Sequence, residues 1–117
     1  MKIKIVELIG NPVLLSPDKA EGLFYTLMTY TFDKNKIVVD FDGYKFLSST
    51  FLNNSFGKII LDLGLNKENY NKKITVKNIR KDDMVDYNLA LDNAFTKSKW
   101  LSKGIDPQKF YTNTNFA

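Results

Sequence analysis

Two carboxylates, Asp40 and Asp42, stand at the end of the apolar run 37–41, just before Gly43. Side chains two residues apart on a strand point to the same face, so this pair could hold a divalent cation. An Asp beside a glycine is more typical of a turn, in which the carboxylate accepts a hydrogen bond from nearby backbone. We therefore expect a turn here, with no metal site and no cofactor.

Few side chains suited to other kinds of catalysis are present, because the chain contains no histidine and no cysteine. This removes the usual general base, the commonest metal ligand and every Ser-His or Cys-His nucleophile. The six glycines never approach the G-x-G-x-x-G or G-x-x-x-x-G-K-S/T spacing that cradles phosphates. We expect no catalytic residues and a protein that is not an enzyme.

Three consecutive hydroxyl side chains, Ser48, Ser49 and Thr50, stand between an apolar segment and a helical pattern. One of them would suffice to cap the helix. A phosphate at this position would meet the positive end of the helix and add about −1.5 to −2 charges to the surface. Capping and a phosphorylation switch both stay open, and Ser49, Thr50 and Ser48 are the phosphorylation candidates.

The net charge of +4 raises the question of nucleic acid. Arg80 is the only arginine among the 17 basic residues, although the planar arginine fork is preferred for phosphate and base recognition. The densest basic stretch, residues 72–81, is followed at once by Asp82 and Asp83. A solvated surface of mixed charge is therefore favoured, and nucleic acid is the less favoured partner.

Helices are predicted from apolar spacing and start signals. Ser16-Pro17-Asp18 opens a helix that extends to about Thr31. A second helix begins at the hydroxyl cluster and ends at Gly64. Its apolar face comprises Phe51, Leu52, Ser55, Phe56, Ile59, Ile60 and Leu63. Gly57 lies within this helix, which predicts a close approach there, most simply by the sheet.

A last helix is expected to begin at Asp82 or Asp83. Its predicted core face comprises Met84, Val85, Tyr87, Leu91, Ala94 and Phe95.

Strands are predicted over residues 2–9, 37–41 and 74–79, with a brief extended piece at 44–47. Residues 33–35 form a predicted turn, and residues 65–73 a polar connector. The order β-α-β-α-β-α implies a single small α/β domain with a mostly parallel or mixed four-stranded sheet packed against helices. The first strand could instead pair antiparallel at an edge. We expect this domain to span residues 1–101, followed by a C-terminal tail, 102–117.

Residues 37–57 resemble the core of the STAS-like domain of unknown function. The shared features are a buried strand ending in Asp-Phe, a glycine turn, and an apolar-Ser-x-Ser/Thr-Phe segment that opens a helix with a Phe-Gly pair, here Phe56-Gly57. This family is a relative of the STAS domains of anti-sigma-factor antagonists. On their phosphorylated segment, Ser49 matches the phosphorylated serine, whereas Ser48 replaces an Asp and Phe51 a Gly.

The resemblance implies a bacterial or phage-associated signalling module that binds a protein partner, such as a histidine-kinase-like ATPase acting as a serine kinase. The expected docking surface is the turn and the helix start that follows it. It comprises Asp42, Gly43, Tyr44, Lys45, Ser48, Ser49, Thr50, Phe51 and Leu52.

Two alternatives remain beside this docking module. One is a nucleic-acid-associated or phage/defence-related protein that uses the lysine-rich stretch 72–81. The other is an interaction protein that docks through the aromatic tail residues Phe110, Tyr111 and Phe116. No apolar run approaches the roughly 20 residues of a membrane-spanning helix. We expect no membrane association and a cytoplasmic location, which the lack of cysteine fits.

Overall fold

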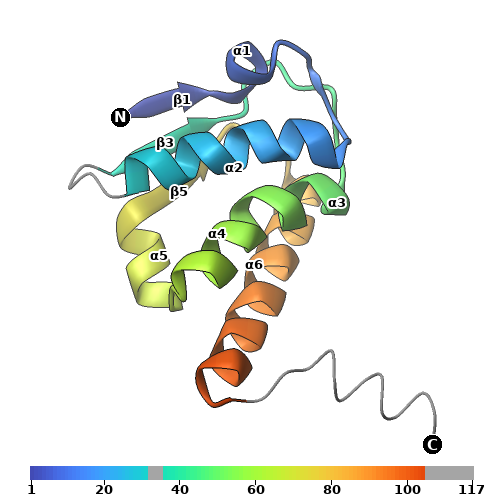
Figure 1. Cartoon of the computed structure of the whole chain (residues 1–117). Coiled ribbons are helices and arrows are strands. Elements are labelled where there is room, and N and C mark those ends of the chain that lie inside the picture. The colour runs from blue at the N-terminus through green and yellow to red at the C-terminus, as the bar shows by residue number, and fades with distance from the viewer. Residues whose placement is uncertain (32–35, 105–117) are drawn as a thin grey trace, which may run out of the picture.

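Three short β-branched segments form one parallel sheet in the computed structural model, which describes residues 1–31 and 36–104 (Figure 1). The strands are β1 (Lys2–Lys4), β3 (Ile37–Asp40) and β5 (Ile74–Lys77), in the spatial order β1-β3-β5. Val39 pairs with Ile3 on one side and Val76 on the other. The strand predicted over residues 37–41 is confirmed as β3, and it lies at the centre of the sheet. The antiparallel alternative for the first strand is wrong, because β1 pairs parallel to β3.

Helices cover only one face of this sheet. Ile3, Val39 and Ile74 point to the covered face, where each is at most 6% exposed. Side chains alternate along a strand, so Lys2 and Lys77 point to the opposite face, as do the β3 residues that pair with them. The side chains of these two lysines are 49% and 46% exposed. Parallel sheets are usually covered on both faces, so the open face distinguishes this domain.

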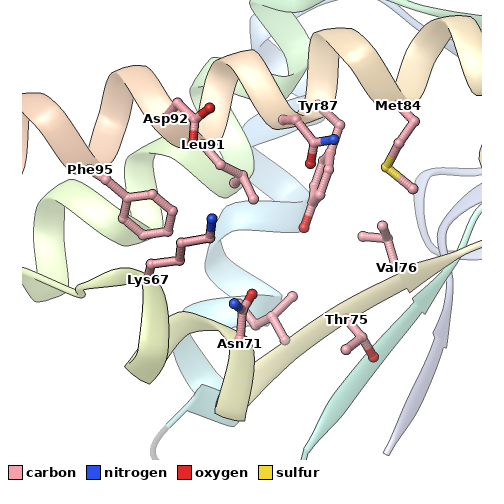
Figure 2. A pocket seen from close by; sticks show the side chains of 11 residues that line it. Lys67, Asn71, Thr75, Val76, Met84, Tyr87, Leu91, Asp92 and Phe95 are labelled. Carbon is pink, nitrogen blue, oxygen red and sulfur yellow. The ribbon is translucent and has the colours of Figure 1, made fainter.

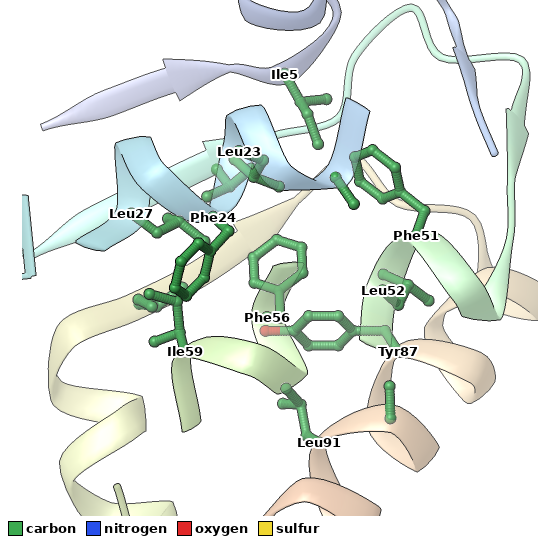
Figure 3. Packing of buried hydrophobic residues seen from close by; sticks show 14 of the residues in the cluster. Ile5, Leu23, Phe24, Leu27, Phe51, Leu52, Phe56, Ile59, Tyr87 and Leu91 are labelled. Atoms are coloured by element: carbon green, nitrogen blue, oxygen red, sulfur yellow. The ribbon is translucent and has the colours of Figure 1, made fainter. Parts of the chain in front are cut away.

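Helix α2 (Pro17–Thr31) packs its apolar stripe against the core, as its spacing predicts. Its start is also as predicted, because the backbone N–H of Lys19 donates to the Ser16 hydroxyl at 3.2 Å. Proline is favourable at the first helical position, since its missing N–H would have no partner there. Leu23 and Leu27 are fully buried and face the following helical segment (Figure 3).

That following segment is helical from residue 49 to residue 63, as predicted. It comprises α3 (Ser49–Leu52), the π-helical turn η1 (Asn53–Gly57) and α4 (Lys58–Leu63). Gly64 ends it in the left-handed conformation, with φ of 61°. Phe56 lies at the centre of the core, stacked on Phe41 at 6.2 Å and edge-on to Tyr87 at 5.2 Å between ring centroids. Contacts between aromatic rings thus connect Phe41, at the end of β3, to the last helix through Phe56. Figure 3 shows Phe56 beside Tyr87.

The predicted strand over residues 2–9 is wrong beyond Lys4. Residues 5–9 form a short helix, α1 (Ile5–Ile9), which Gly10 caps with φ of 74° and an N–H bond to the Val6 carbonyl at 2.8 Å. Glycine adopts this left-handed conformation at no steric cost. The apolar pattern fits a strand and a helical turn equally well, and the cap decides between them.

The four-stranded sheet of the prediction is instead a three-stranded sheet and a separate parallel ladder. The ladder joins β2 (Val13–Leu14) to β4 (Phe46–Leu47). The predicted extended piece at 44–47 therefore pairs with a segment that showed no strand signal. Since β2 precedes α2 and β4 precedes α3, the ladder places the N-termini of these two helices near each other.

The predicted connector 65–73 contains a helix, α5 (Lys67–Lys73). Asn66 caps it by accepting the Asn69 N–H at 2.8 Å, and the buried Tyr70 fixes it to the core. The last helix, α6 (Lys81–Ser102), begins one residue before the earlier of the two predicted starts. Val85, predicted in its core face, is 67% exposed.

The close approach predicted at Gly57 exists, but it comes from α6 and not from the sheet. A Cβ at this position would lie 3.9 Å from the Ala94 Cβ and 4.0 Å from the Ala90 carbonyl oxygen. The predicted turn at 33–35 and the aromatic tail residues Phe110, Tyr111 and Phe116 lie outside the described residues. No helix in the described part of the chain is long and apolar enough to cross a membrane.

Candidate functional site

The three hydroxyls divide into one cap and two exposed groups. The Phe51 N–H donates to the Ser48 hydroxyl oxygen, and that hydroxyl donates to the Leu15 carbonyl, both at 3.0 Å. Ser49 and Thr50 are exposed in the first helical turn. The capping interpretation is therefore confirmed for Ser48, and it leaves the Ser49 and Thr50 hydroxyls at the surface.

The predicted docking surface needs a correction at its helical end. Phe51 and Leu52 are fully buried, at 0% exposure, so their side chains belong to the core. They lie on the inner side of the same helix whose first residues, Ser49 and Thr50, face outward. A helix that packs against a core on one side can present only its other side to a partner.

The prediction that Tyr44 belongs to the docking surface is also wrong, because this side chain is buried, at 9% exposure. Its hydroxyl donates to the Asp83 carboxylate at 2.6 Å and accepts the Arg80 N–H at 2.9 Å. Burial and this carboxylate raise the pKa of Tyr44. The guanidinium of Arg80 lies over the Tyr44 ring and donates to the Lys45 carbonyl. These contacts attach the turn after β3 to the start of α6 and leave Asp42, Gly43 and Lys45 exposed.

Asp40 is the hub of a polar network at the end of β3. Its Oδ1 accepts the Asp42 N–H at 3.0 Å and the Asn78 side-chain amide at 2.8 Å. Its Oδ2 lies 3.4 Å from the Lys2 ammonium and 3.9 Å from that of Lys77. The hydrogen bonds from Asn78 and Asp42, followed by the lysines, lower the pKa of Asp40 to about 2.

The turn interpretation of Asp40 is thus confirmed, because its carboxylate accepts the backbone N–H two residues on. Asn78 reaches it from a left-handed conformation with φ of 60°. Among the described residues, no group of three or more His, Cys, Asp or Glu side chains could hold a metal ion. Asp40 therefore organises the end of the sheet through hydrogen bonds and ion pairs.

Two apolar residues beside the hydroxyls had not been predicted as part of the site. Phe46 is 61% exposed and Leu15 is 45% exposed. Val13 pairs with Phe46 in the β2–β4 ladder, and alternation places Leu15 on the same face as Val13. The Ser48 hydroxyl contacts the Leu15 backbone, so this apolar face adjoins the hydroxyl cluster. In the sequence, the only signal for this face was one apolar side chain in each of two short segments far apart in the chain. The pairing of β2 with β4 brings these two segments together.

Basic side chains of the stretch 72–81 are engaged in contacts within the domain, some local and some with distant segments. Lys72 pairs with Glu68 at 3.2 Å, Lys73 donates to the Thr31 carbonyl, and Arg80 pairs with Asp83. Surface charges engaged in this way offer less to phosphate groups than a free basic stripe would. The nucleic-acid alternative stays a prediction.

These features define a class: a small α/β domain with a parallel sheet, whose exposed hydroxyls open the helical segment after the central strand. The matching family model is described as a STAS-like domain of unknown function, and it covers residues 21–84. The chain belongs to this family, and the resemblance noted in residues 37–57 is confirmed. The matched region includes α2 from residue 21 onward, β3, the hydroxyl cluster and β5. No curated protein and no solved structure matches the chain.

Proposed function

We propose that this chain is a non-enzymatic, cytoplasmic signalling module that binds a protein partner through one surface. The surface comprises the exposed residues of the turn and the helix start together with the two apolar residues of the ladder. They are Leu15, Asp42, Gly43, Lys45, Phe46, Ser49 and Thr50.

The observation that carries the proposal is the pairing of exposed apolar and hydroxyl side chains. Phe46, at 61% exposure, is the most exposed aromatic side chain among the described residues, and Leu15 lies on the same side of the ladder. Aromatic residues in the centre of a patch with a polar rim are typical of protein interfaces. The polar rim is supplied here by Ser49, Thr50 and Lys45.

Phosphorylation at Ser49 would regulate this binding. Ser49 is exposed, whereas the Ser48 hydroxyl is engaged in two hydrogen bonds that a phosphate would break. A phosphate in the first turn of a helix is favoured by the helix dipole, so Ser49 could carry one without unfolding α3. The added charge would lie within the proposed surface and would change which partner that surface accepts.

Affinity capture from the source cells with cross-linking tests the partner surface. Phe46→Asp should abolish capture of the partner, because a charge would replace the apolar centre of the interface. Tyr25→Asp is the matched control, since Tyr25 is 58% exposed on α2, outside the proposed surface. Equal capture by both variants would contradict the proposal.

Incubation with ATP and a lysate of the same cells, followed by mass spectrometry of residues 48–50, tests the switch. We expect phosphate on Ser49 in the wild type and its loss in Ser49→Ala. Partner capture by Ser49→Asp should differ from that by Ser49→Ala. If no phosphate is found on Ser49, Thr50 or Ser48, partner binding is constitutive.

A further inference from the structure

The outward face of α6 carries an apolar stripe that no described segment covers. Tyr87 and Leu91 point from this helix into the core, where they are at most 7% exposed. By contrast, Val85 is 67% exposed, Leu89 is 56% exposed and Trp100 is 42% exposed. With about 3.6 residues per turn, these three side chains lie within about 60° of one another around the helix axis, on the side opposite the core. The C-terminal half of α6 extends beyond α4 and α5 (Figure 1), so the stripe is accessible along the helix.

Two grooves flank this stripe. Met84, Leu91 and Phe95 of α6 point into one groove of about 490 Å³, opposite β5 and α5 (Figure 2). A second groove, of about 240 Å³, lies on the other side of α6, where Asn93 and Lys97 line it together with residues of η1 and α4. The stripe is therefore a ridge between two grooves. Two helices pack by placing the ridge of one into a groove of the other.

The charges of α6 are divided between its two halves. Residues 82–92 contain acidic side chains and no basic one, whereas residues 93–102 contain lysines and no acidic side chain. The helix dipole favours such an order only within the first and last turns. Asp86, Asp92 and Lys97 lie outside these turns of α6, so the dipole does not account for their order.

Four of these charges border the stripe. Helical spacing places Asp86 and Lys97 along one side of it, and Asp92 and Lys99 along the other. None of the four takes part in an ion pair within residues 1–31 and 36–104. Each side of the ridge therefore presents one carboxylate nearer the N-terminus of the helix and one ammonium group nearer its C-terminus.

We infer that α6 pairs with α6 of a second copy of this chain in antiparallel order, across a twofold axis near residues 93–94. A twofold axis repeats every contact, so the acidic half of each helix faces the basic half of the other. Asp86 then lies on the same side of the interface as Lys97 of the second copy, and Asp92 on the same side as Lys99. In a parallel pair, like charges would face each other.

The apolar side chains are complementary in the same arrangement. About this axis, Trp100 of each copy lies level with the gap between Val85 and Leu89 of the other. Each indole ring therefore fills the space between two apolar side chains, and the twofold axis repeats this contact. Because one surface supplies both sides of every apolar and charged contact, the occupant that it fits is a second copy of the chain.

Sedimentation of the full chain over a range of concentrations tests this pairing. We expect the average mass to rise toward that of a dimer. The fluorescence of Trp100, the only tryptophan of the chain, should shift to shorter wavelength as its ring is buried. Leu89→Asp should raise the dissociation constant at least about tenfold, because it places a charge in the apolar centre of the interface. Tyr25→Asp, on α2, is the matched control and should leave the dissociation constant unchanged.

Exchange of the charges tests their pairing across the interface. The double variants Asp86→Lys/Asp92→Lys and Lys97→Asp/Lys99→Asp should each dimerise at least about tenfold more weakly, because like charges then face each other. An equimolar mixture of the two variants should restore dimerisation.

Single cysteines determine the direction of the pair, since the wild-type chain has none. An equimolar mixture of Val85→Cys and Lys103→Cys should be joined by a short thiol-reactive cross-linker, because these positions lie nearly level across the antiparallel interface. Val85→Cys alone should give little cross-linked product. This measurement decides the inference even if a charge variant proves poorly folded.

A chain that stays monomeric up to about 1 mM would overturn the inference. Equal dimerisation of Leu89→Asp and Tyr25→Asp would also overturn it, as would efficient cross-linking of Val85→Cys to itself. Loss of the dimer in Phe46→Asp would assign the contact to the proposed partner surface and would likewise overturn the inference. The outcome is independent of the proposed function, because that surface contains no residue of α6.

Discussion

The Tyr44 hydroxyl donates a 2.6 Å hydrogen bond to the Asp83 carboxylate, across 39 residues of sequence. The same oxygen accepts the Arg80 N–H at 2.9 Å. One side chain from the turn after β3 therefore makes two hydrogen bonds at the N-terminus of α6. A carboxylate in the first turn of a helix is favoured by the dipole. The turn that carries part of the proposed partner surface is therefore fixed to the longest helix of the domain.

Tyr44→Phe removes this hydroxyl and leaves both partners without it. We expect a loss of about 1–2 kcal/mol in the free energy of unfolding, because a hydrogen bond to a charged group is stronger than a neutral one. Urea denaturation measures the change. Tyr25→Phe is the control, and an equal effect of the two substitutions would contradict the role of Tyr44.

Ser48→Ala removes the cap of the helical segment that begins at Ser49. The expected loss is about 1 kcal/mol, since the Phe51 N–H loses its acceptor. Ser49→Ala should change stability by less than about 0.5 kcal/mol, because the side chain is exposed. Thermal denaturation of the two variants distinguishes the cap from the candidate phosphorylation site. If Ser49→Ala proves the more destabilising, the assignment of roles is reversed.

Asp40→Asn should change how the free energy of unfolding depends on pH. Folding lowers the pKa of Asp40 to about 2, from an unfolded value near about 3.9. The folded state thus gains stability from the ionised carboxylate at pH values above about 4, and that gain is lost as the pH falls toward about 2. The variant should be less stable than the wild type near neutral pH and equally stable near pH 2. Melting curves across this range would disprove the linkage if the difference stays constant.

Gly57 can accept one methyl group but not a larger side chain. A Cβ there makes ordinary contacts of 3.7 to 4.0 Å with Leu52, Ala94 and Ala90. Gly57→Ala should therefore stabilise the domain by up to about 1 kcal/mol through helix propensity. Gly57→Leu should destabilise it by roughly 1–3 kcal/mol, because α6 leaves no room for further atoms. Denaturation of both variants tests the packing, and a destabilising alanine would show that α6 lies closer.

Local patterns predicted most of the regular structure. The apolar stripe of α2, with its Ser-Pro-Asp start, was sufficient because capping and amphipathic spacing act within a few residues. The same holds for the helical segment after Ser48 and for the buried run of β3. The short helices α1 and α5 were not predicted. Their local signals are one glycine and one asparagine cap at the ends of ambiguous runs, and these caps act together with the burial of Ile5 and Tyr70 in the core.

By itself, the sequence determined the class of the domain, the family it resembles and the position of Ser48, Ser49 and Thr50 at a helix start. These depend on the order of residue types along the chain. Only the tertiary structure decided which neighbours face outward. It buried Phe51, Leu52 and Tyr44 and exposed Phe46 and Leu15. Within residues 1–31 and 36–104, it also left β5 at the edge of its sheet, with β3 on one side and no strand on the other. The reason is physical: exposure and strand pairing depend on contacts between distant segments, and the same apolar side chain can serve either a core or an interface.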